Sequence, residues 1–209
     1  MGVLSTIGEK NIRCVETYHN TYHYYHLQCW CCSPFIKKYI CVSSEAKREM
    51  KRRFFIPDTR TVAIPNGVIR EKIRRVSGID NPREDTAGTC IVSVGRLSYE
   101  KNFVTVVRAL SSICTDKISY TLVGGGPQES EIRTIAKANS NLKILGAQSR
   151  TRTLEELARA DIVVMPSLWE GRSILQLEAM ALDKPMVISD VPGLREPFAE
   201  GALIDGEQF

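Results

Sequence analysis

Glu170 and Glu178 are two glutamates with seven residues between them, and Gly171 directly follows the first. A short apolar run, residues 162–165, precedes them and predicts a buried strand. Ser173 begins a Ser-x-x-Gln sequence that has the form of a capping box, so we expect a helix to begin there. This helix would include Glu178 and leave Glu170 in the loop before it.

A strand, a glycine-containing loop and a helix N-terminus together form a common anion site. Free backbone N–H groups point outward at the positive end of the helix dipole, where phosphate binds. A carboxylate beside such a site is better suited to accept hydrogen bonds from the hydroxyls of a ribose or a sugar. The alternative is accidental spacing, with Glu178 on a solvated helix face and Glu170 an ordinary loop residue.

The whole segment resembles the C-terminal signature of the family 4 retaining glycosyltransferases, the glycogen-synthase-like group with the GT-B fold. Where that family usually has an aromatic residue and then a glycine after Glu-Gly, this chain has Arg172 and Ser173. The usual backbone approach to the donor sugar therefore need not apply at those two positions. The matching residues are Pro166, Ser167, Glu170, Gly171, Glu178, Ala179, Met180, Ala181, Lys184, Pro185, Ser189 and Asp190.

Composition describes an ordinary globular chain of 209 residues, long enough for one full domain or parts of two. A net charge of +4 is too small to indicate nucleic-acid binding, although it permits anionic ligands and a membrane surface. The absence of a long apolar run predicts no transmembrane helix, and the polar opening residues predict no signal peptide. We therefore expect a cytoplasmic protein, with its seven cysteines as thiols.

A segment rich in histidine and cysteine follows a predicted strand at residues 12–17. On a helix, its three histidines would share one face and could hold zinc, but Cys-x-Cys-Cys is not a structural zinc spacing. We therefore predict no metal site. The resemblance instead implies that His19 faces the donor sugar as a catalytic residue; the alternative is a strand-end histidine without a role. The residues concerned are His19, His23, His26, Cys29, Cys31 and Cys32.

The next predicted elements are a strand at residues 39–42, a helix from Ser43 or Ser44 to about Phe54, and a strand at residues 61–64. Basic residues 51–53 in the last helical turn complement the helix dipole on a solvated face. Peripheral contact with an anionic membrane is the alternative role for them. In the resembling family, a Pro-Asn-Gly stretch such as residues 65–67 marks the crossing between the two domains.

From Thr89 onward, apolar strands alternate with helices, which predicts a parallel, doubly wound α/β sheet. Ligands bind such sheets at the carboxyl ends of the strands. The expected strands are residues 90–94, 120–123, 142–145, 162–165 and 186–188, and the expected helices are residues 103–113, 128–138 and 154–160, with a further one from Ser173.

The loop after the first of these strands, residues 95–102, contains Gly95, Arg96 and Lys101. Gly95 permits close backbone approach, and the two cations suit phosphate oxygens. The loop resembles the family's Gly-Arg-x-x-x-x-Lys sequence. That resemblance implies that these residues bind the donor's diphosphate, together with the helix N-terminus at Ser173 and Ile174.

Two further loops follow later strands. Residues 124–127, Gly-Gly-Gly-Pro, match neither a dinucleotide fingerprint nor a P-loop, and we expect a mainly structural strand-to-helix turn. By resemblance, Ala147 and Gln148 lie where family members contact the nucleotide base. No Asp-x-Asp triplet occurs in the chain, so we expect a metal-independent reaction without a cofactor.

The resemblance implies transfer of a sugar from a UDP- or GDP-sugar to a glycan or lipid-linked acceptor, with retention of configuration, in polysaccharide or glycoconjugate synthesis. Glu178 would bind the ribose hydroxyls. Glu170, as a catalytic residue, would bind the donor sugar with Gly171 and Arg172. Front-face attack is implied, with the leaving phosphate accepting the proton.

The predicted fold is GT-B-like, with a Rossmann-like donor domain and the rear part of a second Rossmann-like acceptor domain. We expect a partial acceptor-side domain at residues 1–65, a linker at 66–88 and a donor domain at 89–209, so that the chain is truncated at its N-terminus and short at its C-terminus. The alternative function is a non-catalytic nucleotide- or partner-binding remnant. A GT-B-like epimerase or phosphorylase is a third hypothesis, which no residue specifically supports.

Overall fold

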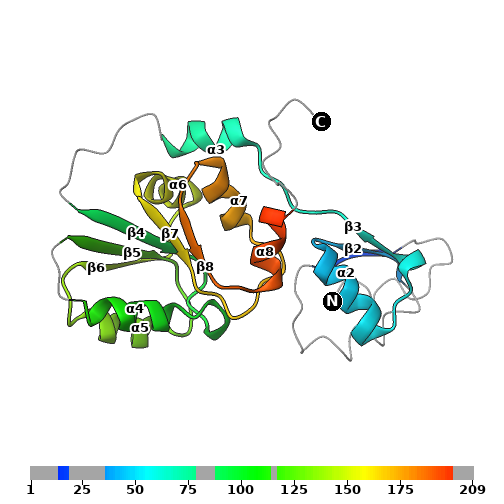
Figure 1. Cartoon of the computed structure of the whole chain (residues 1–209), viewed down its shortest axis with the longest axis horizontal. Helices are drawn as coiled ribbons and strands as arrows, with labels where there is room; N and C mark the ends of the chain where they lie inside the picture. The colour runs from blue at the N-terminus through cyan, green and yellow to red at the C-terminus, as the bar shows by residue number, and fades with distance from the viewer. Residues whose placement is uncertain (1–13, 19–35, 79–87, 114–116, 200–209) are drawn as a thin grey trace. The chain divides into compact units, whose positions relative to one another are not determined.

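The computed structural model of the chain describes residues 14–18, 36–78, 88–113 and 117–199. The chain divides into two compact units, each built on its own parallel sheet (Figure 1). The N-terminal unit comprises Met1–Asn66 with Glu170–Arg172, and the C-terminal unit comprises Gly67–Trp169 with Ser173–Phe209.

The N-terminal unit has a three-stranded parallel sheet in the order β1-β2-β3. The short 3-10 helix η4 directly precedes β3 in the chain. Its helix α2 begins after Ser43, whose Oγ accepts a hydrogen bond from Ala46 N at 3.0 Å. The helix ends at Phe54 and is followed by Phe55, which has a left-handed backbone (φ 56°), so the predicted helix is confirmed. The elements are β1 (Cys14–Tyr18), β2 (Ile36–Cys41), α2 (Ser44–Phe54), η4 (Asp58–Arg60) and β3 (Thr61–Ala63).

The C-terminal unit has a five-stranded sheet in the order β6-β5-β4-β7-β8, with every neighbouring pair parallel. Counted within this unit, the order is 3-2-1-4-5, as in a Rossmann-type sheet, and the predicted doubly wound sheet is confirmed. Strands β5 and β6 are added on one side of β4, and β7 and β8 are then added on its other side, so the order of strand addition reverses between β4 and β7. The strands are β4 (Thr89–Val94), β5 (Ile118–Val123), β6 (Leu142–Gly146), β7 (Ile162–Met165) and β8 (Met186–Ile188).

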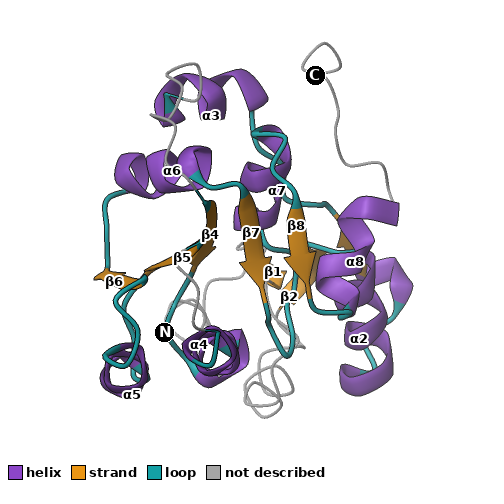
Figure 2. Ribbon diagram, turned by 60° about the vertical axis from the view of Figure 1, so that its left-hand side comes forward, coloured by secondary structure: helices purple, strands orange, loops and turns teal. Residues whose placement is uncertain are grey.

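Helices cover both faces of this sheet (Figure 2). Alternate residues of a strand point to opposite faces, so Ile91 and Val92 of β4 enter different apolar clusters. One cluster includes residues of α4 and α5, and the other includes residues of α3, α6, α7 and α8. The helices are α3 (Arg70–Ser77), α4 (Phe103–Ser111), α5 (Glu129–Ala136), α6 (Arg150–Arg159), α7 (Ile174–Ala181) and α8 (Pro192–Ala199), with a 3-10 helix η5 (Tyr99–Lys101).

Helix α3 lies within the segment that the sequence analysis assigned to a linker. Ile73 is only 4% exposed and packs into the apolar cluster shared with α6 and α7. The helix ends at Gly78, whose left-handed backbone (φ 63°) favours glycine. The segment thus contributes a packed layer to the C-terminal unit, a helix that the sequence analysis did not predict.

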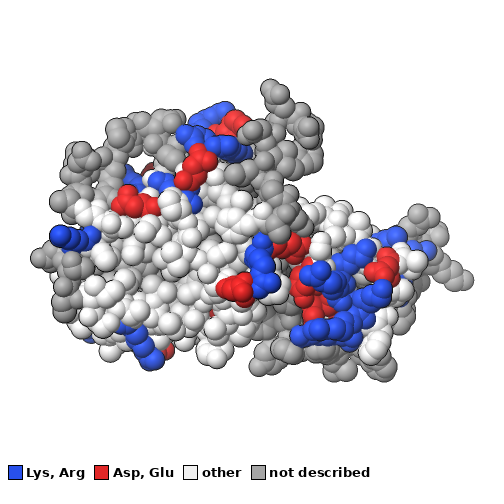
Figure 3. All heavy atoms as spheres, viewed as in Figure 1, with Lys and Arg blue, Asp and Glu red and all other residues white. Residues whose placement is uncertain are grey.

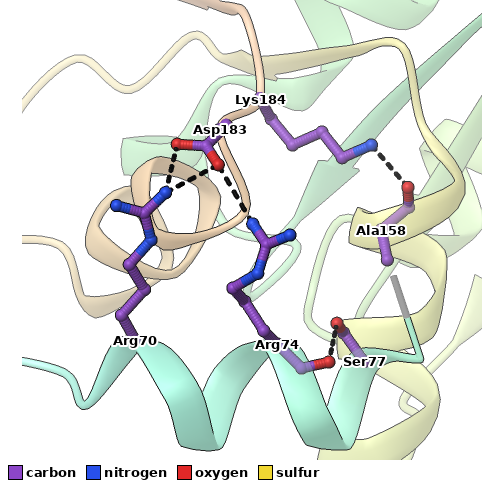
Figure 4. A network of polar contacts seen from close by, with 6 residues as sticks. All are labelled: Arg70, Arg74, Ser77, Ala158, Asp183 and Lys184. Carbon is purple, nitrogen blue, oxygen red and sulfur yellow. Dashed lines mark hydrogen bonds and ion pairs between the residues drawn. The ribbon is translucent and has the colours of Figure 1, made fainter. Parts of the chain in front are cut away.

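The turn between α7 and β8 forms polar contacts with α3 and α6 (Figure 4). Asp183 forms ion pairs with Arg70 at 2.8 Å and with Arg74 at 3.0 Å, both on α3. Lys184 Nζ donates hydrogen bonds to the carbonyl oxygens of Ala158 and Ala160 at the end of α6. These carbonyls have no partner within the helix, so Lys184 serves as a C-terminal cap of α6. Lys184 is also the lysine of the Lys-Pro pair noted in the sequence.

Among the helices in the described ranges, none combines the length and the hydropathy that crossing a bilayer requires.

Candidate functional site

The candidate site lies at the point where the sheet of the C-terminal unit changes direction. The loops that follow β4 and β7 lead to opposite sides of the sheet, and ligands of such sheets bind at this point, at the carboxyl ends of the strands. Two contacts join the loops. Leu168 N donates to Glu100 O at 2.8 Å, and the rings of Tyr99 and Trp169 lie 5.9 Å apart.

The loop after β4 contains both predicted diphosphate-binding cations. Gly95 has a φ of +155°, and a Cβ added there would lie 3.9 Å from Lys101 Cδ and 3.2 Å from Phe103 Cζ. The stem of Lys101 therefore folds back over Gly95, while Arg96 is exposed. The structure thus places both cations at the end of the central strand of the sheet.

The glycine-rich loop after β5 packs directly against this cationic loop. A Cβ at Gly124, where φ is +145°, would lie 1.8 Å from Gly95 O, and one at Gly126 would lie 2.5 Å from Leu97 O. Leu97 N also donates to Gly125 O at 3.0 Å. Only glycine permits this approach, so the loop supports the backbone of the cationic loop, in agreement with the structural role predicted for it.

The loop after β6 carries the predicted base-contacting residues, Ala147 and Gln148, which are both exposed. Gln148 Nε2 donates to Leu145 O at 2.8 Å. The amide of Gln148 is therefore turned back onto its own strand. Hydrogen bonding of this N–H group to a base would require it to leave that acceptor.

Helix α7 begins where the sequence predicts. Ser173 is its N-cap, and its Oγ accepts a long hydrogen bond from Gln176 N at 3.5 Å. The second half of the expected capping box is wrong, because Gln176 Oε1 accepts no hydrogen bond from Ser173 N, while its Nε2 donates to Leu194 O of α8 at 2.6 Å. Ile174, 48% exposed, lies in the first turn, where backbone N–H groups have no acceptor within the helix.

Glu178 lies in the interior of this helix and is only 4% exposed. The alternative that it occupies a solvated helix face is therefore wrong. Burial raises the pKa of its carboxyl, and the guanidinium of Arg150 partly opposes that rise. Arg150 Nη2 lies 2.6 Å from Glu178 Oε1 and thereby joins the start of α6 to α7.

Sequence reasoning missed Arg150 because the helix was expected to begin only at Leu154. Helix α6 in fact begins at Arg150, after Ser149, whose Oγ accepts from Arg152 N at 3.2 Å. Ser149 is a favourable N-cap residue three positions after Gly146, which ends the strand, and this signal could have found the correct start.

The remaining predicted site residues are not grouped with the C-terminal unit. Glu170, Gly171 and Arg172 are grouped with the N-terminal unit, where Asn66 Nδ2 donates to Arg172 O at 3.5 Å. Glu170 is half-buried, whereas Gly171 and Arg172 are buried. His19 and the other histidines and cysteines of residues 19–32 lie outside the described residues.

The C-terminal unit by itself therefore combines two cations, a helix N-terminus and a buried carboxylate around one end of its sheet. The cations and the helix N-terminus suit a diphosphate. The carboxylate suits a group rich in hydroxyls, because an ionised carboxylate only accepts hydrogen bonds.

Comparison with known proteins identifies the family of the chain. The family model described as "Glycosyl transferases group 1" matches residues 71–207, and the model described as "Glycosyltransferase Family 4" matches residues 1–72. An Escherichia coli UDP-Gal:alpha-D-GlcNAc-diphosphoundecaprenol alpha-1,3-galactosyltransferase is 26% identical over 167 residues, which are 74% of this chain and 43% of that protein. An uncharacterised glycosyltransferase of Methanocaldococcus jannaschii is 30% identical over 174 residues, 75% of this chain and 43% of its own length.

Among solved structures, Anabaena HepE in complex with UDP and glucose has a TM-score of 0.74 at 18% identity, covering 93% of this chain and 57% of HepE. This likeness confirms the GT-B-like fold that the sequence predicted. The chain spans less than half the length of the two curated relatives. Since the first family model covers more than half of its residues, the chain belongs to the glycosyl transferases group 1 family.

Proposed function

We propose that this chain is the nucleotide-sugar-binding part of an enzyme that transfers a sugar to an acceptor hydroxyl with retention of configuration. The observation that carries the proposal is the buried carboxylate of Glu178 on α7, the helix that follows the loop in contact with the cationic loop. An ionised carboxylate loses its hydration in the interior. The equally buried Glu49 of α2 is compensated by two arginines of its own helix, whereas among the described residues the structure pairs Glu178 with a single arginine from another helix.

Arg96 and Lys101 bind the donor's diphosphate in this proposal. As the bond to the sugar breaks, negative charge increases on the leaving phosphate, and fixed cations stabilise it most in that state. Backbone N–H groups at Ser173 and Ile174 add the positive end of the α7 dipole. No group of strong basicity is needed, because the leaving phosphate accepts the proton of the acceptor hydroxyl.

The two carboxylates bind the hydroxyl groups of the donor in this proposal. Glu178 accepts hydrogen bonds from the ribose, and Glu170 binds the donor sugar with Gly171 and Arg172. His19, which lies outside the described residues, is the second catalytic residue of this proposal. The nucleotide base lies by Ala147 and Gln148.

The donor and acceptor classes rest on the related proteins. HepE has been solved with UDP and glucose, and the E. coli relative is named for a UDP-sugar donor and a diphosphoundecaprenol acceptor. We therefore infer a UDP-sugar donor, with a GDP-sugar as the second choice, and a glycan or lipid-linked acceptor in polysaccharide or glycoconjugate synthesis. The reaction is proposed to need no metal or other cofactor.

A cytoplasmic location with peripheral membrane contact is a further part of the proposal. Figure 3 shows Lys and Arg side chains gathered over the N-terminal unit, where α2 ends in Lys51, Arg52 and Arg53. Part of this charge is compensated, because Lys51 pairs with Asp58 and both arginines pair with Glu49. The remaining positive charge suits an anionic membrane surface.

Thermal unfolding of the chain with UDP, GDP and ADP tests the proposal. A ligand at 100 times its Kd adds about 2.7 kcal/mol of stability, which raises the Tm by roughly 5–10 °C for a chain of this size. One nucleotide should give this shift, and Arg96→Ala should lose most of it. Arg159→Ala, which removes an exposed arginine from the far end of α6, is the matched control.

The release of UDP from a UDP-sugar, measured in parallel, separates the two functions considered. Stabilisation with release supports the transferase, whereas stabilisation without release or transfer supports the non-catalytic nucleotide-binding alternative. A folded chain that none of the three nucleotides stabilises would contradict both.

A further inference from the structure

Arg150 and Glu178 form an asymmetric ion pair between two helices, whereas the similarly asymmetric pair of Arg52 and Glu49 lies within one helix. The Arg150 side chain is 64% exposed, while the Glu178 side chain is 6% exposed, and the atoms that meet are 2.6 Å apart. A pair between two exposed side chains contributes little, because water already solvates both charges. Here one partner has left water, so the guanidinium replaces part of the hydration that Glu178 has lost.

The position of Arg150 is unfavourable for its own helix. It is the first residue of α6, whose first turn contains no acidic residue and also carries Arg152. A cation at a helix N-terminus opposes the positive end of the dipole. A locally unfavourable residue is expected mainly where another interaction or a function compensates for it, and the contact with Glu178 is that compensation.

The neighbouring arginines do not share this arrangement. Arg152 of the same helix pairs with Glu155 and Glu156 on its own helix. Arg70 and Arg74 of α3, which also packs against α7, pair with Asp183. Among the charged side chains of the described residues, Arg150 is thus the one that the structure pairs with Glu178.

We propose that Arg150 is a positioning residue, whose guanidinium fixes the buried carboxylate of Glu178 so that it accepts hydrogen bonds from a nucleotide's ribose. The inference rests on the ribose-binding role proposed above for Glu178. A carboxylate offers two oxygens with about four acceptor sites, so a single arginine contact at Oε1 leaves sites for two hydroxyls. The arginine is exposed, so it can adjust to a ligand while keeping its contact.

Loss of Arg150 has a consequence that a merely structural residue would not have. Burial raises the pKa of Glu178, and Arg150 is the cation that opposes this rise. Without the guanidinium, the carboxyl would take up a proton at a higher pH than in the wild-type chain. On acidification, the nucleotide affinity of the variant would therefore begin to fall at a higher pH than the affinity of the wild-type chain.

The experiment follows the side-chain carboxyl of Glu178 by NMR titration of ¹³C-glutamate-labelled chain, with the signal assigned through Glu178→Gln. The variants are Arg150→Ala, Arg150→Lys and, as the matched control on the same helix, Arg152→Ala. Arg150→Ala should move the titration midpoint to higher pH and weaken UDP binding about tenfold at neutral pH. Arg150→Lys should restore most of both properties, and Arg152→Ala should change neither.

Two results would overturn the inference. One is an unchanged titration and an unchanged UDP affinity in Arg150→Ala. The other is tighter UDP binding in that variant, which would mean that Arg150 obstructs the carboxylate. If the titration responds as expected but the wild-type chain binds no UDP, the proposed function fails, while the fixing of the carboxylate by Arg150 is supported.

Discussion

Glutamine at position 178 would keep the shape of the buried side chain and remove its charge. Glu178 is 4% exposed, and its carboxyl has a raised pKa, so the fold disfavours the ionised form. The partner Arg150 is 64% exposed and returns to water at little cost. We therefore expect Glu178→Gln to be at least as stable as the wild-type chain at pH 7.5.

The sign of the pH dependence follows from the direction of the shift. A raised pKa means that the folded chain binds more protons than the unfolded chain between the two pKa values. Wild-type stability therefore falls as pH rises through this window, which begins at the ordinary carboxyl pKa. Glu178→Gln lacks this decline, so its advantage in urea unfolding should be larger at pH 7.5 than at pH 4.

Nucleotide binding should change in the opposite direction. Hydrogen bonds to a charged group contribute about 1.5–3 kcal/mol, so loss of the carboxylate should weaken UDP binding by roughly tenfold to a hundredfold in calorimetric titration. Weaker binding together with undiminished stability would identify a functional carboxylate. Unchanged affinity, or a loss of several kcal/mol in stability, would refute the reasoning.

Three further predictions concern the framework of the site, each measured by urea unfolding. Gly124→Ala should destabilise the chain by about 3 kcal/mol, because the added Cβ would meet Gly95 O. Gly67→Ala is its control and should have a small effect, because no atom lies within 4 Å of the Cβ added there. Lys184→Met should cost about 1–3 kcal/mol by uncapping α6, and an unchanged stability would contradict the cap. Asp183→Asn, which keeps a residue suited to the left-handed backbone there (φ 55°), should cost no more than about 1 kcal/mol, since the ion pairs are partly exposed. A cost that persists in 1 M salt would contradict an ionic origin.

The sequence predicted the alternating strands and helices of the C-terminal unit because each strand is a short apolar run that ends at a glycine or a polar loop. The same pattern placed Gly95, Arg96 and Lys101 at a strand end, where the structure has them. Such local patterns carry the information that a parallel sheet needs, since both faces of its strands are buried.

Features that depend on tertiary contacts were not predictable in the same way. Helix α3 has few apolar residues, and it is held by Ile73 and by ion pairs to Asp183, more than a hundred residues away in sequence. Gln176 satisfies a carbonyl of α8 where the local pattern favoured a return to Ser173. The burial of Glu178 and its pairing with Arg150 likewise arise only when α6 and α7 pack together.

The most direct test of the account maps UDP onto the chain by the chemical shifts of its backbone amides. Binding at the proposed site should shift the amides of Gly95 to Lys101, Gly146 to Gln148, and Ile174 and Leu175, and these shifts should be lost in Arg96→Ala. Amides of α4 and α5, which cover one face of the sheet, should stay unchanged. Shifts that gather on those helices instead, or shifts that persist in Arg96→Ala, would contradict a nucleotide site at the carboxyl ends of β4 and β7.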